Sequence, residues 1–101
     1  MVEVTIKRTG DGHTVQTRQG AVVPEYESRK LAIHIPAIDS DGCAVLRPGD
    51  NLVCEERLYN NLDGTLLDGW TSPLRLADKR REGEHLLLIC DITGSKTLLT
   101  V

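Results

Sequence analysis

EHLLLICDITGSKTLLTV, residues 84–101, is the stretch that decides the fold this sequence predicts. Residues 86–90 are five consecutive apolar residues, so an extended strand here is apolar on both of its faces. We expect a central strand that is buried from both sides. Residues 93–96 favour a turn, and residues 97–101 then alternate between two faces. The stretch therefore predicts a hairpin with a defined register.

Short extended segments separated by turns recur along the rest of the chain. Residues 2–8 alternate strictly between apolar and polar side chains, and Gly10 and Gly12 supply a tight turn after them. Pro24 removes an amide donor, so the segment around it is expected to be an edge strand or a loop. The remaining predicted strands cover residues 13–19, 30–35, 51–59 and about 70–76.

Seven or eight such segments are typical of a two-layer β-sandwich or a small barrel. No segment of 12 or more residues has a clean 3.6-residue period, which disfavours α/β architecture. Ser72 and Pro73 have the pattern of a helix start, and Gly83 follows as a helix stop. We expect one all-β domain over residues 1–101, a small antiparallel β-sandwich or a partly open barrel, with at most one short helical turn near residues 73–82.

The end of the chain resembles the closing hairpin of immunoglobulin-like domains. In RREGEHLLLICDITGSKTLLTV, residues 80–101, a charged turn precedes a central apolar strand that carries a cysteine, Cys90. The resemblance covers about a fifth of the chain and implies a sandwich. The sequence departs from the family because no tyrosine lies two residues before Cys90, and because Cys54 and Cys90 are closer together than the pair that joins the two sheets.

The amino-acid composition limits the classes of function that this protein can have. Apolar residues make up 40% and charged residues 27% of the 101 residues, which indicates a folded globular protein. The net charge of -3 lacks the basic surplus of nucleic-acid binders, and no apolar run approaches the ~20 residues of a membrane helix. Three cysteines and no apolar leader favour a reducing compartment with free thiols. We expect a cytoplasmic protein without nucleic-acid or membrane partners.

The residues that most often carry chemistry are scattered. Among the cysteines and histidines no two lie within four residues of each other, so we expect neither a metal site nor a cofactor. Glu55 and Glu56 are adjacent on opposite strand faces, and we expect acidic residues here to be solvated. Cys43, flanked by small residues in a predicted loop, is the thiol most open to reaction.

Two surface features are the candidates for binding. Trp70 lies in a predicted loop beside Asp68 and near Tyr59, and a lone tryptophan there either anchors a partner or plugs one end of the fold. Residues 79–81 form the one basic cluster in the sequence. It either contacts an acidic surface of a partner or is a solvated charged turn. Tyr26 is a weaker candidate. The predicted binding residues are Trp70, Tyr59, Asp68, Lys79, Arg80 and Arg81, and there are no predicted catalytic residues.

The sequence predicts a non-catalytic protein–protein interaction module, either a small assembly or accessory subunit or an antagonist. The size is typical of phage and mobile-element proteins, and an unpaired edge strand offers a route to a homo-oligomer. The partner is expected to be another protein. Two alternatives stay open: a carbohydrate-binding β-sandwich, for which three aromatic residues are few, and a cysteine-dependent enzyme built on Cys43.

Overall fold

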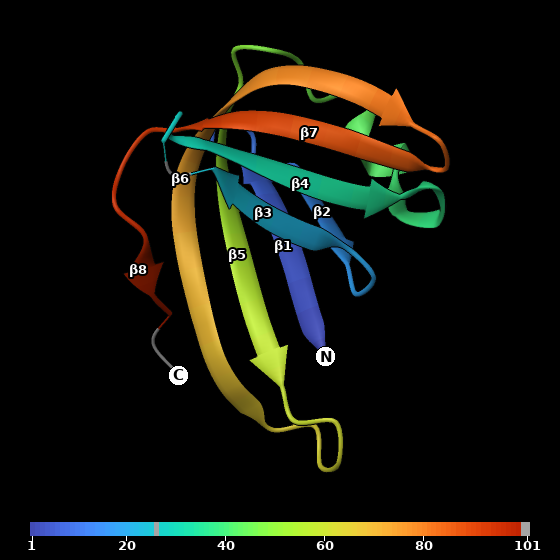
Figure 1. The fold of residues 1–101 in the computed structure, drawn as a ribbon, viewed down its shortest axis with the longest axis vertical. Coiled ribbons are helices and arrows are strands. Elements are labelled where there is room, and N and C mark those ends of the chain that lie inside the picture. The colour runs from blue at the N-terminus through green and yellow to red at the C-terminus, as the bar shows by residue number, and fades with distance from the viewer. Residues whose placement is uncertain (26, 100–101) are drawn as a thin grey trace.

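The computed structural model describes residues 1–25 and 27–99, and these form one eight-stranded antiparallel sheet with two 3₁₀ turns (Figure 1). The sheet order is β2-β1-β5-β6-β7-β4-β3, and β8 pairs with β6 outside this order. The all-β prediction is confirmed. The strands are β1 (Val2–Arg8), β2 (Thr14–Thr17), β3 (Ala21–Glu25), β4 (Lys30–Pro36), β5 (Asn51–Tyr59), β6 (Leu66–Glu82), β7 (His85–Ile92) and β8 (Thr97–Leu98).

The expected division into two packed sheets, with the immunoglobulin-like arrangement, is not what the structure shows. The sheet is undivided because β6 is continuous over 17 residues and pairs with β5 along its first part and with β7 along its second. The alternative, a partly open barrel, is not shown either, because the sheet does not close or curl on itself. Residues 18–20 connect the two edge strands, but β2 and β3 do not pair with each other in the described part of the chain.

The helical turn expected near residues 73–82 is also absent, because this segment belongs to β6 and pairs with β7 up to Glu82. The register shifts between Leu76 and Asp78, which places a bulge where the apolar alternation ends. Pro73 is tolerated because it lies where the second neighbour of β6 changes: β8 pairs at Thr71, whereas β7 pairs from Leu74 onward.

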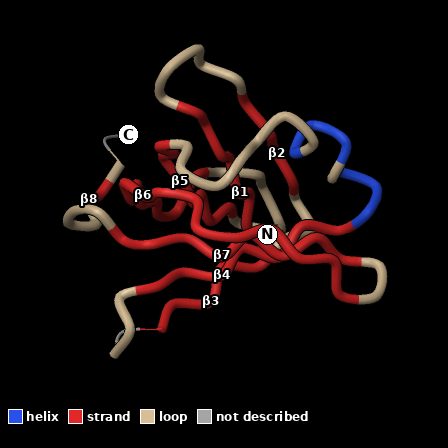
Figure 2. Tube along the Cα trace, turned by 90° about the horizontal axis from the view of Figure 1, so that it is seen from above, coloured by secondary structure: helices blue, strands red, loops and turns tan. Residues whose placement is uncertain are grey.

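The helical structure of the described residues consists of two 3₁₀ turns, Ala37–Asp39 and Asp41–Cys43. They lie together beside β2, as the blue segments in Figure 2 show. Within residues 1–25 and 27–99, no helix has the length and apolar character needed to cross a membrane.

β7 lies between β6 and β4, so its predicted central position is confirmed. Its predicted burial from both sides is not complete, because the core cluster covers the face of Leu88 and Cys90 whereas Ile89 on the other face is half-buried. Both edges of β7 are occupied, and the predicted hairpin between residues 86–90 and 97–101 does not form. Instead, Thr97 and Leu98 pair with Thr71 and Trp70 of β6. Residues 100 and 101 of that predicted hairpin lie outside the described residues.

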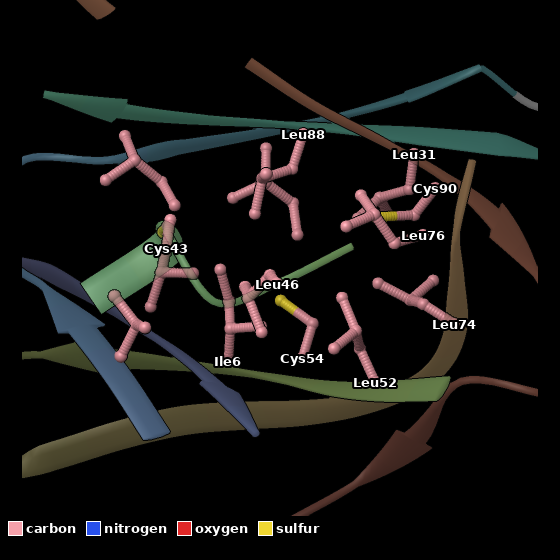
Figure 3. Close-up of a cluster of buried hydrophobic side chains, with 14 residues drawn as sticks. Ile6, Leu31, Cys43, Leu46, Leu52, Cys54, Leu74, Leu76, Leu88 and Cys90 are labelled. Atoms are coloured by element: carbon pink, nitrogen blue, oxygen red, sulfur yellow. The ribbon is translucent and has the colours of Figure 1, made fainter. Parts of the chain in front are cut away.

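One face of the sheet carries a single cluster of aliphatic and cysteine side chains. In Figure 3, Leu88 and Leu31 of β7 and β4 point toward Ile6, Cys54 and Leu52 of β1 and β5. The cluster also includes Leu46 and Cys43 from the segment that follows β4. No aromatic residue belongs to this cluster among the described residues, in agreement with the aliphatic interior that the composition predicts.

Candidate functional site

Trp70 lies on β6 and not in a loop, because strand pairing between β5 and β6 extends down to Leu66. Its side chain is half-buried, and the Lys96 Nζ atom lies 4.7 Å from the centre of its ring. An ammonium over an indole face is a cation–π contact that holds both side chains in place. Trp70 is therefore neither a fully buried core residue nor a fully exposed one, since part of its side chain packs against the fold and the rest faces solvent.

Two other predicted residues lie next to Trp70. Tyr59 ends β5 and is half-buried, while Asp68 is exposed on β6 opposite Leu58. The Asp68 carboxylate accepts a hydrogen bond of 2.9 Å from the Gly69 N–H, so it shapes the local backbone. The structure brings Trp70, Tyr59 and Asp68 to the same end of the β5–β6 pair.

The basic cluster lies at the other end of β6. The Lys79 ammonium donates a hydrogen bond of 3.1 Å to the Cys43 carbonyl, and Arg80 is paired with Asp78 at 2.7 Å. Arg81 is exposed. Lys79 lies nine positions after Trp70 on the same strand, which is up to about 30 Å of extended chain. The structure does not bring the two groups into one compact surface, and Tyr26 lies outside the described residues.

A cavity of about 460 Å³ opens between β3 and β4 on one side and β5 and β6 on the other. Trp70 does not line it, but two lining residues are its neighbours: Glu56 is its partner in the β5–β6 register, and Lys96 lies over its ring. The cavity lies where the apolar cluster ends, on the same face of the sheet. We call it the Glu56 cavity. Its lining consists of four apolar residues (Val22, Pro24, Leu31 and Ile92), two polar residues (Ser72 and Glu56) and two cationic residues (Arg29 and Lys96).

Glu56 is the residue that sequence reasoning placed wrongly, since we expected a solvated carboxylate. It is half-buried, and burial raises the pKa of its carboxyl, an effect that the charge of Lys96 partly offsets. None of the ion pairs within 4.0 Å among the described residues includes Glu56. The signal was present in the sequence, because Glu56 follows Cys54 by two residues and so shares its buried strand face.

The two cations of the cavity are exposed. Lys96 belongs to the segment between β7 and β8 and is held over the Trp70 ring. Arg29 ends the turn between β3 and β4 with a φ of 53°, a left-handed conformation that only glycine adopts without cost. Its carbonyl accepts a hydrogen bond of 2.9 Å from the Ile92 N–H. The fold thus keeps an arginine where glycine is the usual residue.

A prediction about Glu56 follows from the direction of its pKa shift. The pKa of the Glu56 carboxyl is higher in the folded protein than its ordinary value of 4.5. The folded state therefore binds the proton more tightly than the unfolded state, and the free energy of unfolding falls as the pH rises from the ordinary pKa through the raised pKa. We expect Glu56→Gln to raise the free energy of unfolding at pH 7 and to leave it unchanged at pH 3, where Glu56 is neutral too. Urea unfolding at the two pH values measures this, and an equal gain at both would contradict it.

The three thiols are buried and are not among the residues that line this cavity, although Cys90 and Cys54 are the strand partners of Leu31 and Ser72, which do line it. Burial raises the pKa of Cys43 to about 11 and that of Cys90 to about 12, and it raises the pKa of Cys54 as well. Cys43, which we expected to be the most reactive thiol, has no exposed surface because Leu46 and Val15 belong to the same buried cluster. A buried thiol with a raised pKa is inert.

We therefore expect slow thiol labelling in the folded protein. A rise in pKa from 9.0 to about 11 alone lowers the thiolate fraction of Cys43 at neutral pH by about 100-fold. Reaction with Ellman's reagent at pH 7.5 should be at least that much slower in buffer than in guanidinium chloride. Fast release of one equivalent of thionitrobenzoate from the folded protein would show that a thiol is accessible.

The described residues contain no group of three or more histidine, cysteine, aspartate or glutamate side chains arranged to hold a metal ion. No protein-family model matches this chain, and a comparison with curated proteins finds no match either.

Proposed function

We propose that this protein is a non-catalytic binding module that holds another protein at the Trp70 end of its sheet, as an accessory subunit or an antagonist does. The observation that carries the proposal is the Glu56 cavity, a mostly apolar opening of about 460 Å³ beside a half-exposed tryptophan. A tryptophan next to a cavity that admits a partner's side chain has the features of a binding hot spot.

The loop between β5 and β6 supports the same surface. Residues 60–65 are held by hydrogen bonds within the loop: the Asn60 N–H donates to the Thr65 carbonyl at 2.8 Å, and the Thr65 N–H donates to the Asp63 carboxylate at 3.0 Å. At the tip, Leu62 is 96% exposed. A loop that is already ordered loses little conformational freedom on binding, so an exposed leucine on it is a favourable anchor.

Two leucines near Trp70 extend this apolar surface. Leu98 of β8 is paired with Trp70, and Leu67 lies three residues before Trp70 on β6. The side chains of Leu98 and Leu67 are largely exposed. Exposed apolar side chains that lie together are typical of interaction sites, and we propose that the three leucines act together with Trp70 in this way. The proposed contact surface therefore consists of the Glu56 cavity, Trp70 and the three leucines Leu62, Leu67 and Leu98.

The alternatives have weaker support. Carbohydrate binding needs aromatic rings that stack on sugars, and the cavity lining contains no aromatic residue within the part of the chain that the structure describes. A cysteine-dependent mechanism needs an accessible thiolate, and all three thiols are buried with raised pKa values. Both alternatives keep a direct test, a glycan array for the first and the thiol labelling described above for the second.

Trp70→Ala is the test of the proposed function. Because Trp70 is half-buried, we expect its loss to lower the free energy of unfolding by less than the ~3 kcal/mol that truncation of a fully buried aromatic costs, and to abolish partner capture. Affinity capture from the native host followed by mass spectrometry compares wild type with the variant, while urea unfolding measures stability.

Val45→Ala is the matched control, because Val45 is also partly exposed but belongs to the loop near Lys79 at the far end of β6. The proposal requires a protein that wild type and Val45→Ala retain and that Trp70→Ala loses. Equal capture by all three proteins would contradict it, and so would a set of captured proteins that no replicate reproduces.

A further inference from the structure

We propose that the Glu56 cavity binds an aliphatic chain that carries an ammonium at one end and a carboxylate at the other, the group that a C-terminal lysine of a partner chain presents. The inference deepens the proposed function, since it names the chemistry by which the partner is recognised. It is carried by the chemistry of the cavity's lining: a half-buried carboxylate, two exposed cations, and four apolar residues.

Glu56 supplies the half-buried carboxylate. It projects from β5 on the face that carries the apolar cluster, with the buried hydroxyl of Ser72 on the neighbouring strand. The Glu56 carboxylate is half removed from water, and no ion pair within 4.0 Å among the described residues includes it; the charge of Lys96 acts on it from farther away. An ammonium placed there gains a charge-assisted hydrogen bond in a site of lowered dielectric.

Arg29 and Lys96 supply the two cations. Both side chains are exposed, and they come from different parts of the chain, the β3–β4 turn and the segment before β8. Lys96 is fixed over the Trp70 ring, and Arg29 occupies its place at the cost of a left-handed backbone. Two exposed cations attract a carboxylate and disfavour a ligand that carries a positive charge alone.

Four residues of the lining are apolar. Val22 and Pro24 of β3, Leu31 of β4 and Ile92 of β7 line the cavity, and they offer methylene groups a surface away from water. The carboxylate of a simple fatty acid would pair with Arg29 and Lys96, but its apolar tail would lie against the charged Glu56. An alkylammonium would satisfy Glu56 but face both cations. The zwitterion is the ligand that meets all three parts of the cavity.

The test is a titration of the isolated protein with three probes of equal chain length: 6-aminohexanoate, hexanoate and hexylammonium. Backbone amide shifts of the lining residues report binding by NMR. We expect saturable shifts with 6-aminohexanoate and at least about 10-fold weaker binding of the two single-charge probes, because each lacks one charge-assisted pair. Equal or tighter binding of hexanoate or hexylammonium would overturn the inference, as would no saturable shift at about 10 mM 6-aminohexanoate.

Two variants make the assignment specific. Glu56→Gln keeps the shape of the side chain and removes its charge, and we expect it to weaken 6-aminohexanoate binding by about 10-fold while binding of hexanoate is not weakened. Glu82→Gln, an exposed glutamate at the far end of β6, should leave the affinity unchanged. Unchanged affinity in Glu56→Gln would overturn the role of Glu56.

A peptide that ends in lysine and the same peptide with an amidated C-terminus separate the sources of this ligand. Binding of the free acid but not of the amide supports a partner's C-terminal lysine. Binding of 6-aminohexanoate without either peptide assigns the cavity to a free small molecule and overturns the partner assignment. The titration needs no partner protein, so its failure leaves the Trp70→Ala capture result standing, and failed capture leaves the titration result standing.

Discussion

Leu88→Ala is expected to lower the free energy of unfolding by about 2–5 kcal/mol, a large part of the 5–15 kcal/mol that a domain of this kind has. Leu88 has no exposed surface and lies on β7, the central strand, opposite Ile33 of β4. Its removal leaves a cavity that neighbouring strands cannot fill, because their backbones are fixed on both sides by sheet pairing. Urea unfolding followed by circular dichroism measures the effect.

Leu62→Ala is the control for that experiment. It removes the same atoms from a leucine that is 96% exposed at the tip of the β5–β6 loop, so stability should change by no more than about 0.5 kcal/mol. Comparable losses in both variants would mean that burial does not distinguish the two leucines, and the placement of β7 at the centre of the sheet would be wrong.

Gly20→Ala has the second largest expected effect, a loss of about 1–3 kcal/mol. Gly20 lies in the three-residue connection between the edge strands β2 and β3. A Cβ atom there would lie 2.7 Å from the Thr17 Cγ2 atom and 2.9 Å from the His34 carbonyl oxygen, and this second contact is with backbone that pairs inside the sheet. The connection must shift, and thermal unfolding reports the cost.

Gly10→Ala is the matched substitution, because a Cβ atom at Gly10 meets nothing within 4 Å. Its thermal midpoint should stay close to that of wild type. A Gly20→Ala protein as stable as Gly10→Ala would show that the path between β2 and β3 has room for a side chain, and that the close approach to His34 does not constrain the sheet.

The candidate site was only partly visible in the sequence. Trp70 was identified because a lone tryptophan among aliphatic residues is conspicuous, and the structure places it beside the Glu56 cavity. Glu56 was missed because a glutamate is solvated in most proteins, although its strand face was readable from Cys54. Arg29 and Lys96 had no signal of their own, since residues far apart in sequence come together in the cavity lining.

The sequence by itself determined the extended character of the chain and the aliphatic make-up of its core. Strict alternation in residues 2–8 and the apolar run at residues 86–90 specify strands, and each corresponds to a strand in the sheet. The lack of phenylalanine made an aliphatic core unavoidable. These properties are local, because the side-chain period of two and the composition of the chain do not depend on which strands become neighbours.

Only the tertiary structure decided which strands pair. The Ser72-Pro73 pattern has the local form of a helix start, yet residues 73–82 continue β6 because β5 and β7 offer it hydrogen-bonding partners. For the same reason residues 97 and 98 pair with β6, since both edges of β7 are already occupied. Pairing joins residues distant in sequence, and its energy is shared among all neighbouring strands, so the single sheet and the cavity emerge only when the whole chain is folded.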